Sequence, residues 1–312
     1  MKLWLGISTG NEYTHQITDI HPLGLISFFY RKILEGAAPF VPKGLDLFLD
    51  SGAFSAHNSG KDVDLAEYCA FIHNTPQYWD TYVNLDVIPG TGGVLVTPEE
   101  RDRAAGRGWQ NYLDMKADGL DPIPVYHYGE SKKWLHKMLD HGCGYIGLGG
   151  MVGMTTKMRA KWLDSIFREL SDDAGMPAVK THGFGITSTP LMLRYPWYSV
   201  DSTSWLVLTL NGYIYLPLVG EDGSWRYDVT PQTVTCSRKH SHMKQEGKHS
   251  AHFRELAKAR LTAWLEECGV NWEQVATDYQ ARARCNLIVF HRMAEHKLAQ
   301  PFTSAYIQSM FF

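Results

Sequence analysis

The sequence predicts an α/β protein, a (β/α)8 barrel of the TIM type with a small basic subdomain near its C-terminal side. Strand and helix signals alternate along residues 1–205, and seven or eight such units favour closure of a parallel sheet into a barrel. Acidic residues or glycine pairs follow several of the strands, where such barrels build their active sites. We therefore expect a barrel core with the active site over residues 1–205. Residues 206–312 would supply a hairpin, the basic subdomain and C-terminal helices that complete the barrel.

The predicted strands are short apolar runs that end in small or polar residues. In chain order they are Leu3–Ser8, Leu45–Leu49, Tyr82–Ile88, Ile123–Tyr128, Tyr145–Leu148, Val179–Phe184 and Trp197–Val200. Segments with helical spacing lie between them, namely Leu25–Leu34, Leu65–His73, Thr97–Lys116, Ser131–Leu139 and Thr155–Leu170. The third of these helices has the clearest start, because a capping hydroxyl, a proline and two acidic residues open it.

The pattern changes after Asp201. Two apolar runs, Leu206–Leu210 and Tyr213–Leu216, flank an Asn-Gly pair, which predicts a β-hairpin with a type I′ turn. Helices are expected at Leu261–Cys268 and Trp272–His296.

Composition places the chain among ordinary globular proteins. Of 312 residues, 44% are apolar and 20% are charged, and the formal net charge of −3 does not suggest a general nucleic-acid binder. Five scattered cysteines and no signal peptide indicate reduced thiols in a cytoplasm, the host cytoplasm if the protein is phage-encoded. No apolar run approaches the roughly 20 residues that cross a bilayer, so no membrane partner is expected.

Four strand ends carry groups suited to chemistry: Asp50, Asp86, the pair Gly149-Gly150, and Asp201. Any single aspartate there could instead cap the next helix. On a closed barrel all of them would meet at one mouth, and paired carboxylates suit reactions at an anomeric carbon.

Three other features would shape the pocket. Phe54 could lie over a planar ligand or pack in the core, and His127 ends the fourth strand, where it could line the pocket. The diglycine Gly149-Gly150 would let backbone approach a ligand closely, although barrel diglycines also bind phosphates.

Together the motifs resemble the tRNA-guanine transglycosylases. Asp50-Ser51-Gly52-Ala53-Phe54 is similar to that family's DSGGF/Y motif, and Gly147-Leu148-Gly149-Gly150 to its glycine-rich recognition loop. His182-Gly183-Phe184-Gly185-Ile186 resembles its H-x-x-G-[VI] segment, and Leu210-Asn211-Gly212 its R-N-G. Asp86 matches the aspartate that recognises the base, and Asp201 falls where the nucleophilic aspartate lies. The motifs keep the family's order over residues 45–220.

The short chain looks like the phage-type branch, which exchanges guanine in DNA for 7-deazaguanine bases such as preQ0. The resemblance implies that Asp201 attacks C1′ and forms a covalent intermediate, while Asp50 shuttles the proton. Asp86 and the Gly149-Gly150 backbone would read the base edges, with Phe54 stacked on its face. The implied partners are DNA and a free 7-deazaguanine base, and a homodimer is left open.

Three rival interpretations remain at this point. The same chemistry could act on tRNA, as in the queuosine- and archaeosine-type enzymes. A retaining glycosidase or nucleosidase would also need two carboxylates at a barrel mouth. A non-catalytic nucleic-acid-binding subunit is disfavoured, because Asp50 and Asp201 are both present.

The family's zinc motif, C-x-C-x-x-C with a distant His, is largely absent. The matching region keeps Cys236, with His240 and His242 nearby, and this spacing matches no common zinc template. We therefore expect no required cofactor, with a mixed structural zinc site on these residues as the disfavoured alternative.

The region from Cys236 to Arg260 is basic. It holds seven Lys or Arg residues against two Glu, together with four histidines. Such a segment could hold a phosphate backbone through Arg238, Lys239 and Lys244, although charge runs are commonly solvated helix faces.

Overall fold

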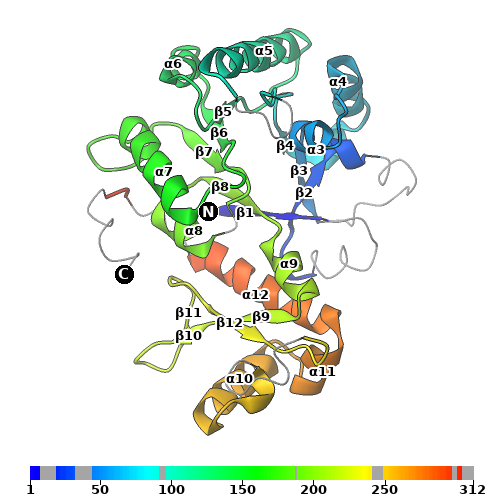
Figure 1. Ribbon diagram of the computed structural model, residues 1–312, viewed down its shortest axis with the longest axis vertical. Coiled ribbons are helices and arrows are strands. Elements are labelled where there is room, and N and C mark those ends of the chain that lie inside the picture. Colours follow the sequence, from blue (N-terminus) through cyan, green and yellow to red (C-terminus); the bar gives the residue numbers. More distant parts are fainter. Residues whose placement is uncertain are drawn as a thin grey trace.

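The computed structural model describes residues 1–7, 19–31, 44–90, 96–186, 188–240, 249–296 and 301–303. Its centre is one curled sheet of eight strands that are all parallel, compatible with a TIM-like α/β architecture (Figure 1). The strands are β1 (Lys2–Gly6), β2 (Leu23–Ser27), β3 (Asp46–Asp50), β4 (Trp79–Tyr82), β5 (Val125–His127), β6 (Tyr145–Gly149), β7 (Lys180–Gly183) and β8 (Ser199–Ser202).

The strand order β4-β3-β2-β1-β8-β7-β6-β5 places the first and last strands side by side in the middle of the sheet. Beyond the two outer strands, Val83 and Ile123 form a single parallel bridge. Two backbone hydrogen bonds flank this bridge, from Ile123 N to Tyr82 O and from Asn84 N to Ile123 O, both at 2.9 Å. Because every strand runs the same way, the residues that follow the strands gather at one edge of the sheet.

Helices follow most of the strands. They are α3 (Ala53–Asn58), α4 (Leu65–Asn74), α5 (Pro98–Ala117), α6 (Lys132–Asp140), α7 (Thr156–Leu170), α8 (Thr189–Arg194) and α9 (Ser204–Leu210). The predicted start of α5 is confirmed: Thr97 caps it and exchanges hydrogen bonds with Glu100 in a complete capping box. The predicted helices that correspond to α4, α6 and α7 are confirmed as well, with ends that differ by one residue at most.

The prediction of a helix over Leu25–Leu34 is wrong at its start. Leu23–Ser27 is strand β2, which pairs with both β1 and β3, and Phe28–Tyr30 forms a single 3-10 turn after it. A strand in a parallel sheet is covered on both faces, so its short apolar run cannot be told from a buried helix by periodicity.

The predicted hairpin is also wrong. Ser204–Leu210 is helix α9, and Tyr213–Leu216 (β9) pairs instead with Gln232–Thr235 (β12) in an antiparallel ladder. Gly212 adopts a φ of 84°, directly after the C-cap of α9. The Asn-Gly pair therefore ends a helix, a position that favours glycine for the same left-handed conformation that a type I′ turn requires.

The rest of the chain forms a second apolar core. Strands β9 and β12, the short pair β10 (Leu218–Val219) and β11 (Trp225–Arg226), and helices α10 (Glu255–Glu267) and α11 (Trp272–Thr277) lie together in Figure 1. The predicted helix Trp272–His296 is interrupted at Asp278, after which α12 (Tyr279–His296) begins.

Helix α12 joins the two cores. One of its faces, which includes Leu287 and Phe290, packs into the core of the sheet, and another, which includes Val289 and Met293, packs against β9, β12 and α10. The division of the chain at residue 205 remains a prediction. Among the residues described, none of the helices combines the length and apolar character needed to cross a membrane.

Candidate active site

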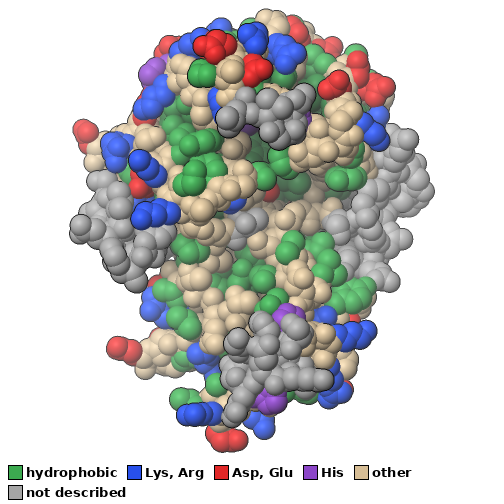
Figure 2. Space-filling model, viewed as in Figure 1, with side chains coloured by type: hydrophobic (Ala, Val, Ile, Leu, Met, Phe, Trp, Pro, Cys, Tyr) green, Lys and Arg blue, Asp and Glu red, His purple; other side chains and the backbone are tan. Residues whose placement is uncertain are grey.

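A cavity of about 900 Å³ opens at the edge of the sheet where the strands end. Figure 2 shows a hollow near the middle of one face, between α3 and α9, with hydrophobic side chains around it. Every residue that the sequence assigned to the pocket lines this cavity: Asp50, Phe54, Asp86, His127, Gly149, Gly150 and Asp201. The strand ends therefore meet as predicted, although the roles of these residues are not settled by their position.

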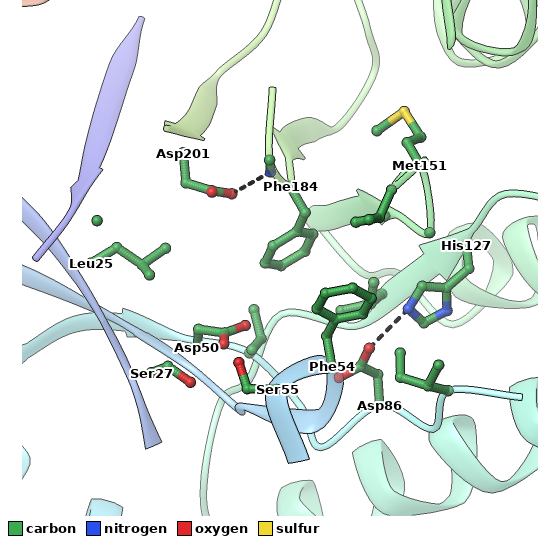
Figure 3. A pocket seen from close by; sticks show the side chains of 18 of the residues that line it. Leu25, Ser27, Asp50, Phe54, Ser55, Asp86, His127, Met151, Phe184 and Asp201 are labelled. Carbon is green, nitrogen blue, oxygen red and sulfur yellow. Dashed lines mark hydrogen bonds and ion pairs between the residues drawn. The ribbon is translucent and has the colours of Figure 1, made fainter. Parts of the chain in front are cut away.

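Asp201 lies in β8 and is held by hydrogen-bond donors. Its Oδ1 atom accepts a hydrogen bond from the Gly185 backbone N–H at 2.9 Å (Figure 3). The same atom lies 3.2 Å from His182 Nε2. These contacts hold the carboxylate in one orientation, which suits a nucleophile that must meet its target atom in line.

His182 is itself firmly positioned. It is fully buried, stacks on Phe48 with ring centroids 4.6 Å apart, and places Nδ1 2.6 Å from Ser199 Oγ. A serine hydroxyl that donates to Nδ1 leaves Nε2 as the protonated nitrogen, so His182 can donate to Asp201.

Asp50, the last residue of β3, has a different environment. Its Oδ2 atom accepts a hydrogen bond from Gly52 N at 3.1 Å. Burial raises the pKa of Asp50 to about 7, and the negative charges of Asp86 and Asp201 act in the same direction. A carboxyl group with this pKa can both give and take a proton near neutral pH.

The turn after Asp50 depends on Gly52. Its φ is 78°, and a Cβ atom there would lie 2.6 Å from the backbone N of Phe29. Any other residue would both strain the backbone and collide with the neighbouring strand end.

The predicted strand Tyr82–Ile88 is wrong beyond its first residue, because β4 ends at Tyr82. Asp86 lies in the segment after β4, where it belongs to a chain of charged side chains. Ser51 Oγ donates to its Oδ1 atom at 2.9 Å, and His127 Nε2 lies 2.8 Å from its Oδ2 atom. The other ring nitrogen of His127, Nδ1, lies 2.9 Å from Glu130 Oε1. Burial lowers the pKa of His127, but hydrogen bonds to Asp86 and Glu130 more than offset this and raise it to about 10. His127 is therefore an imidazolium between two carboxylates, and it orients Asp86 through its occupied ring nitrogens.

The glycines of and after β6, Gly147 as well as the diglycine, have a packing role that sequence reasoning did not anticipate. A Cβ atom on Gly150 would lie 3.0 Å from both His127 Cβ and Tyr128 N, and one on Gly147 would lie 2.4 Å from the Phe184 ring. Glycine is required here so that β6 can lie close to its neighbours. The same bare backbone also lines the cavity.

Two aromatic rings occupy the centre of the cavity in Figure 3. Phe54 and Phe184 lie between the Asp50 and Asp201 side and the Asp86 and His127 side. Phe54 is 44% exposed, although a phenyl ring at the start of a helix normally packs into the core. Its exposure indicates a surface for a flat ligand rather than a core contact.

Sequence reasoning missed several residues of the cavity. Phe184 was assigned only to a motif and a strand end, whereas its ring reaches the cavity centre. Ser27 was hidden by the wrong assignment of β2 as helix, and Ser55 and Met151 had no distinguishing pattern. Their position in the chain could have identified these four residues, because each lies at the end of a strand of the sheet or within five residues after it.

The basic segment is only partly described. Arg238 forms an ion pair with Glu273 and lies over the Trp272 ring, 5.2 Å from its centroid, while Lys239 is exposed. Lys244 lies outside the described residues. The ion pair with Glu273 therefore neutralises the charge of Arg238, one of the three residues expected to bind phosphate.

The remnant of the zinc motif does not come together in the described part of the chain. Cys236 is fully buried in the second core, where burial raises the pKa of its thiol to about 12. His240 packs edge-on against Tyr213, and His242 lies outside the described residues. Over the ranges that the structure covers, no three His, Cys, Asp or Glu residues are arranged to hold a metal ion.

The arrangement as a whole places two carboxyl groups in different environments. Asp201 is surrounded by donors, Asp50 titrates near neutrality, and aromatic rings lie between them and the Asp86–His127 pair. Such a cavity can hold a planar base and offer both a nucleophile and a proton carrier to its glycosidic bond. Compared with protein-family models and with curated proteins, the sequence finds no match.

Proposed function

We propose that the protein is a DNA-guanine transglycosylase that exchanges guanine for a 7-deazaguanine base. The observation that carries the proposal is the convergence of Asp50, Asp86 and Asp201, each with different hydrogen-bond partners, on one cavity with two central phenyl rings. Enzymes that use two carboxyl groups in two roles place them in different environments, because one attacks while the other exchanges a proton.

In the first half of the proposed reaction, an Asp201 oxygen attacks C1′ of the target nucleotide. The bond from C1′ to N9 of guanine breaks, its electron pair goes to the base, and Asp50 supplies a proton to the departing ring. In the second half, the incoming base gives its N9 proton to Asp50 and attacks C1′, which releases Asp201. Two displacements retain the configuration at C1′.

Recognition of the base would use the opposite side of the cavity. The Asp86 carboxylate can accept hydrogen bonds from the N–H groups of guanine, and the ion pair with His127 keeps it oriented. Phe54 and Phe184 would contact the faces of the ring. The target nucleotide must leave the helical stack to enter such a cavity.

The finer architecture belongs to the same proposal. A closed (β/α)8 barrel is supported by the strand order and by the bridge that links the two outer segments of the sheet. The preference for DNA over tRNA rests on the sequence, namely the reduced cysteine cluster and the short chain.

The test is incorporation of radiolabelled guanine into duplex DNA or into bulk tRNA. We expect label in DNA, with loss of incorporation in both Asp201→Asn and Asp50→Asn. Label in tRNA alone would assign the same chemistry to the other substrate. Label in neither, together with release of free sugar from a nucleoside or glycoside, would contradict the proposal in favour of a hydrolase.

A further inference from the structure

The hydroxyl group of Ser27 lies beside the proton-carrying carboxyl group. Ser27 and Asp50 end adjacent parallel strands and are directly paired in register, and both line the cavity. Figure 3 shows the Ser27 hydroxyl and the Asp50 carboxyl group on the same side of the cavity. The two residues are close because Ser27 ends β2, the strand that pairs with β3.

In the described part of the chain, the Ser27 oxygen is buried without a hydrogen-bond partner. The Ser27 hydroxyl group acts on Asp50 so as to lower its pKa, although the raising effect of burial is larger. The geometry of the two groups nevertheless falls short of a well-formed hydrogen bond. A buried hydroxyl without a partner is costly, so a partner is expected in some state of the protein.

Space for such a rearrangement is present. A Cβ atom on Gly52 would lie 2.9 Å from Ser27 Oγ, so the absent side chain leaves the hydroxyl free to turn. Asp50 accepts the Gly52 N–H through Oδ2, which leaves its other oxygen, Oδ1, available as an acceptor within the described residues.

We propose that Ser27 is a positioning residue for Asp50: its hydroxyl turns to donate a hydrogen bond to the carboxylate whenever Asp50 has lost its proton. The inference rests on the proposed function for its place in a reaction. When Asp50 protonates the departing base, the new carboxylate accepts the Ser27 O–H. When the incoming base returns a proton to Asp50, this hydrogen bond is released. Ser27 itself gains and loses no proton.

The experiment measures the pKa of Asp50 in different backgrounds, without relying on catalysis. The side-chain carboxyl carbon resonance of Asp50 is assigned by its absence from the same protein with Asp50→Asn and is followed against pH in each protein. The midpoint of this titration gives the pKa of Asp50 in the folded state. Ser27→Ala should move this midpoint upward by about one pH unit, since the carboxylate loses a donor. Ser27→Thr keeps a hydroxyl group and should therefore show the same midpoint as the wild type.

Ser171→Ala is the matched control, because Ser171 carries another buried hydroxyl without a partner, outside this cavity. It should leave the midpoint unchanged. The inference is overturned if Ser27→Ala leaves the midpoint in place, or if Ser171→Ala moves it as far. In the exchange assay, the limb of the pH profile that Asp50 controls should move with the midpoint. A shifted midpoint in a protein that exchanges no base would support the Ser27–Asp50 pairing and reject the proposed function.

Discussion

Replacing Asp50 by asparagine should stabilise the protein at neutral and alkaline pH while abolishing turnover. Asparagine keeps the shape of the side chain and can still accept the Gly52 N–H, but it carries no charge in the cavity. The wild-type carboxyl group has a pKa of about 7 in the folded protein against an ordinary value of 3.8. The folded state therefore binds this proton more tightly than the unfolded chain, and the wild type loses stability as pH rises from about 4 to 7.

The size of the effect follows from the pKa shift. Each pKa unit corresponds to about 1.4 kcal/mol, so the full shift would cost the wild type about 4 kcal/mol above pH 7. Because the side chain is partly exposed to the open cavity, solvent reduces this, and we expect a gain of about 2 kcal/mol for Asp50→Asn. For a chain of this length, that corresponds to a rise in melting temperature of about 3 °C.

Urea unfolding of both proteins over a series of pH values measures the difference directly. The two curves should coincide below about pH 4, separate between about pH 4 and 7, and stay parallel above that range. Asp62→Asn, which removes an exposed carboxylate, should show no such divergence. The assignment of a raised pKa to Asp50 would be refuted if the difference in free energy of unfolding between the two proteins were constant over the whole pH range. It would also be refuted if Asp50→Asn became less stable relative to the wild type as the pH rises.

Three further predictions concern other parts of the molecule. His21 is buried, and burial lowers its pKa to about 4, so the folded state resists protonation of this residue. The free energy of unfolding should therefore fall by up to about 3 kcal/mol as the pH drops from 6.5 to 4. His21→Gln should flatten this loss in urea unfolding, and an unchanged slope would contradict the prediction. Charge reversal at Arg238, Lys239 and Lys244 should weaken polynucleotide binding and reduce its salt dependence. The affinity for the free base should stay the same, and an equal loss of base affinity in a calorimetric titration would contradict the prediction. A chelator should leave the melting temperature unchanged, whereas stoichiometric zinc with unfolding on its removal would make Cys236 a metal ligand.

Much of the site could be predicted because parallel strands bring their carboxyl ends together. Once Asp50, Asp86 and Asp201 are assigned to strand ends, their convergence follows from the fold class without any knowledge of side-chain contacts. The helix at Thr97 was equally accessible, since a capping box is a local signal.

The errors arose where one local pattern fits two structures. The run at β2 is short and apolar, so it fits a helix or a strand, and its misassignment removed Ser27 from the site. The Asn211-Gly212 pair fits a hairpin turn and a helix end equally well, and only the burial of Trp205 and Thr209 on α9 decides between them.

The charge state of the site lay beyond sequence reasoning for a different reason. The imidazolium of His127 depends on Asp86 and Glu130, and only Glu130 is near it in the chain. The pKa of Asp50 likewise depends on burial and on two carboxylates, Asp86 and Asp201, that are distant in the chain. Such quantities come from tertiary contacts.

The central claim is that Asp201 forms a covalent bond to the sugar, and trapping that bond tests it most directly. Enzyme is incubated with guanine-containing DNA and no acceptor base, then denatured and run on a gel. The wild type should show a protein–DNA adduct that survives denaturation, and Asp201→Asn, which keeps the shape but not the nucleophile, should show none. An adduct of wild-type intensity in Asp201→Asn would contradict the account and place the nucleophile on another strand.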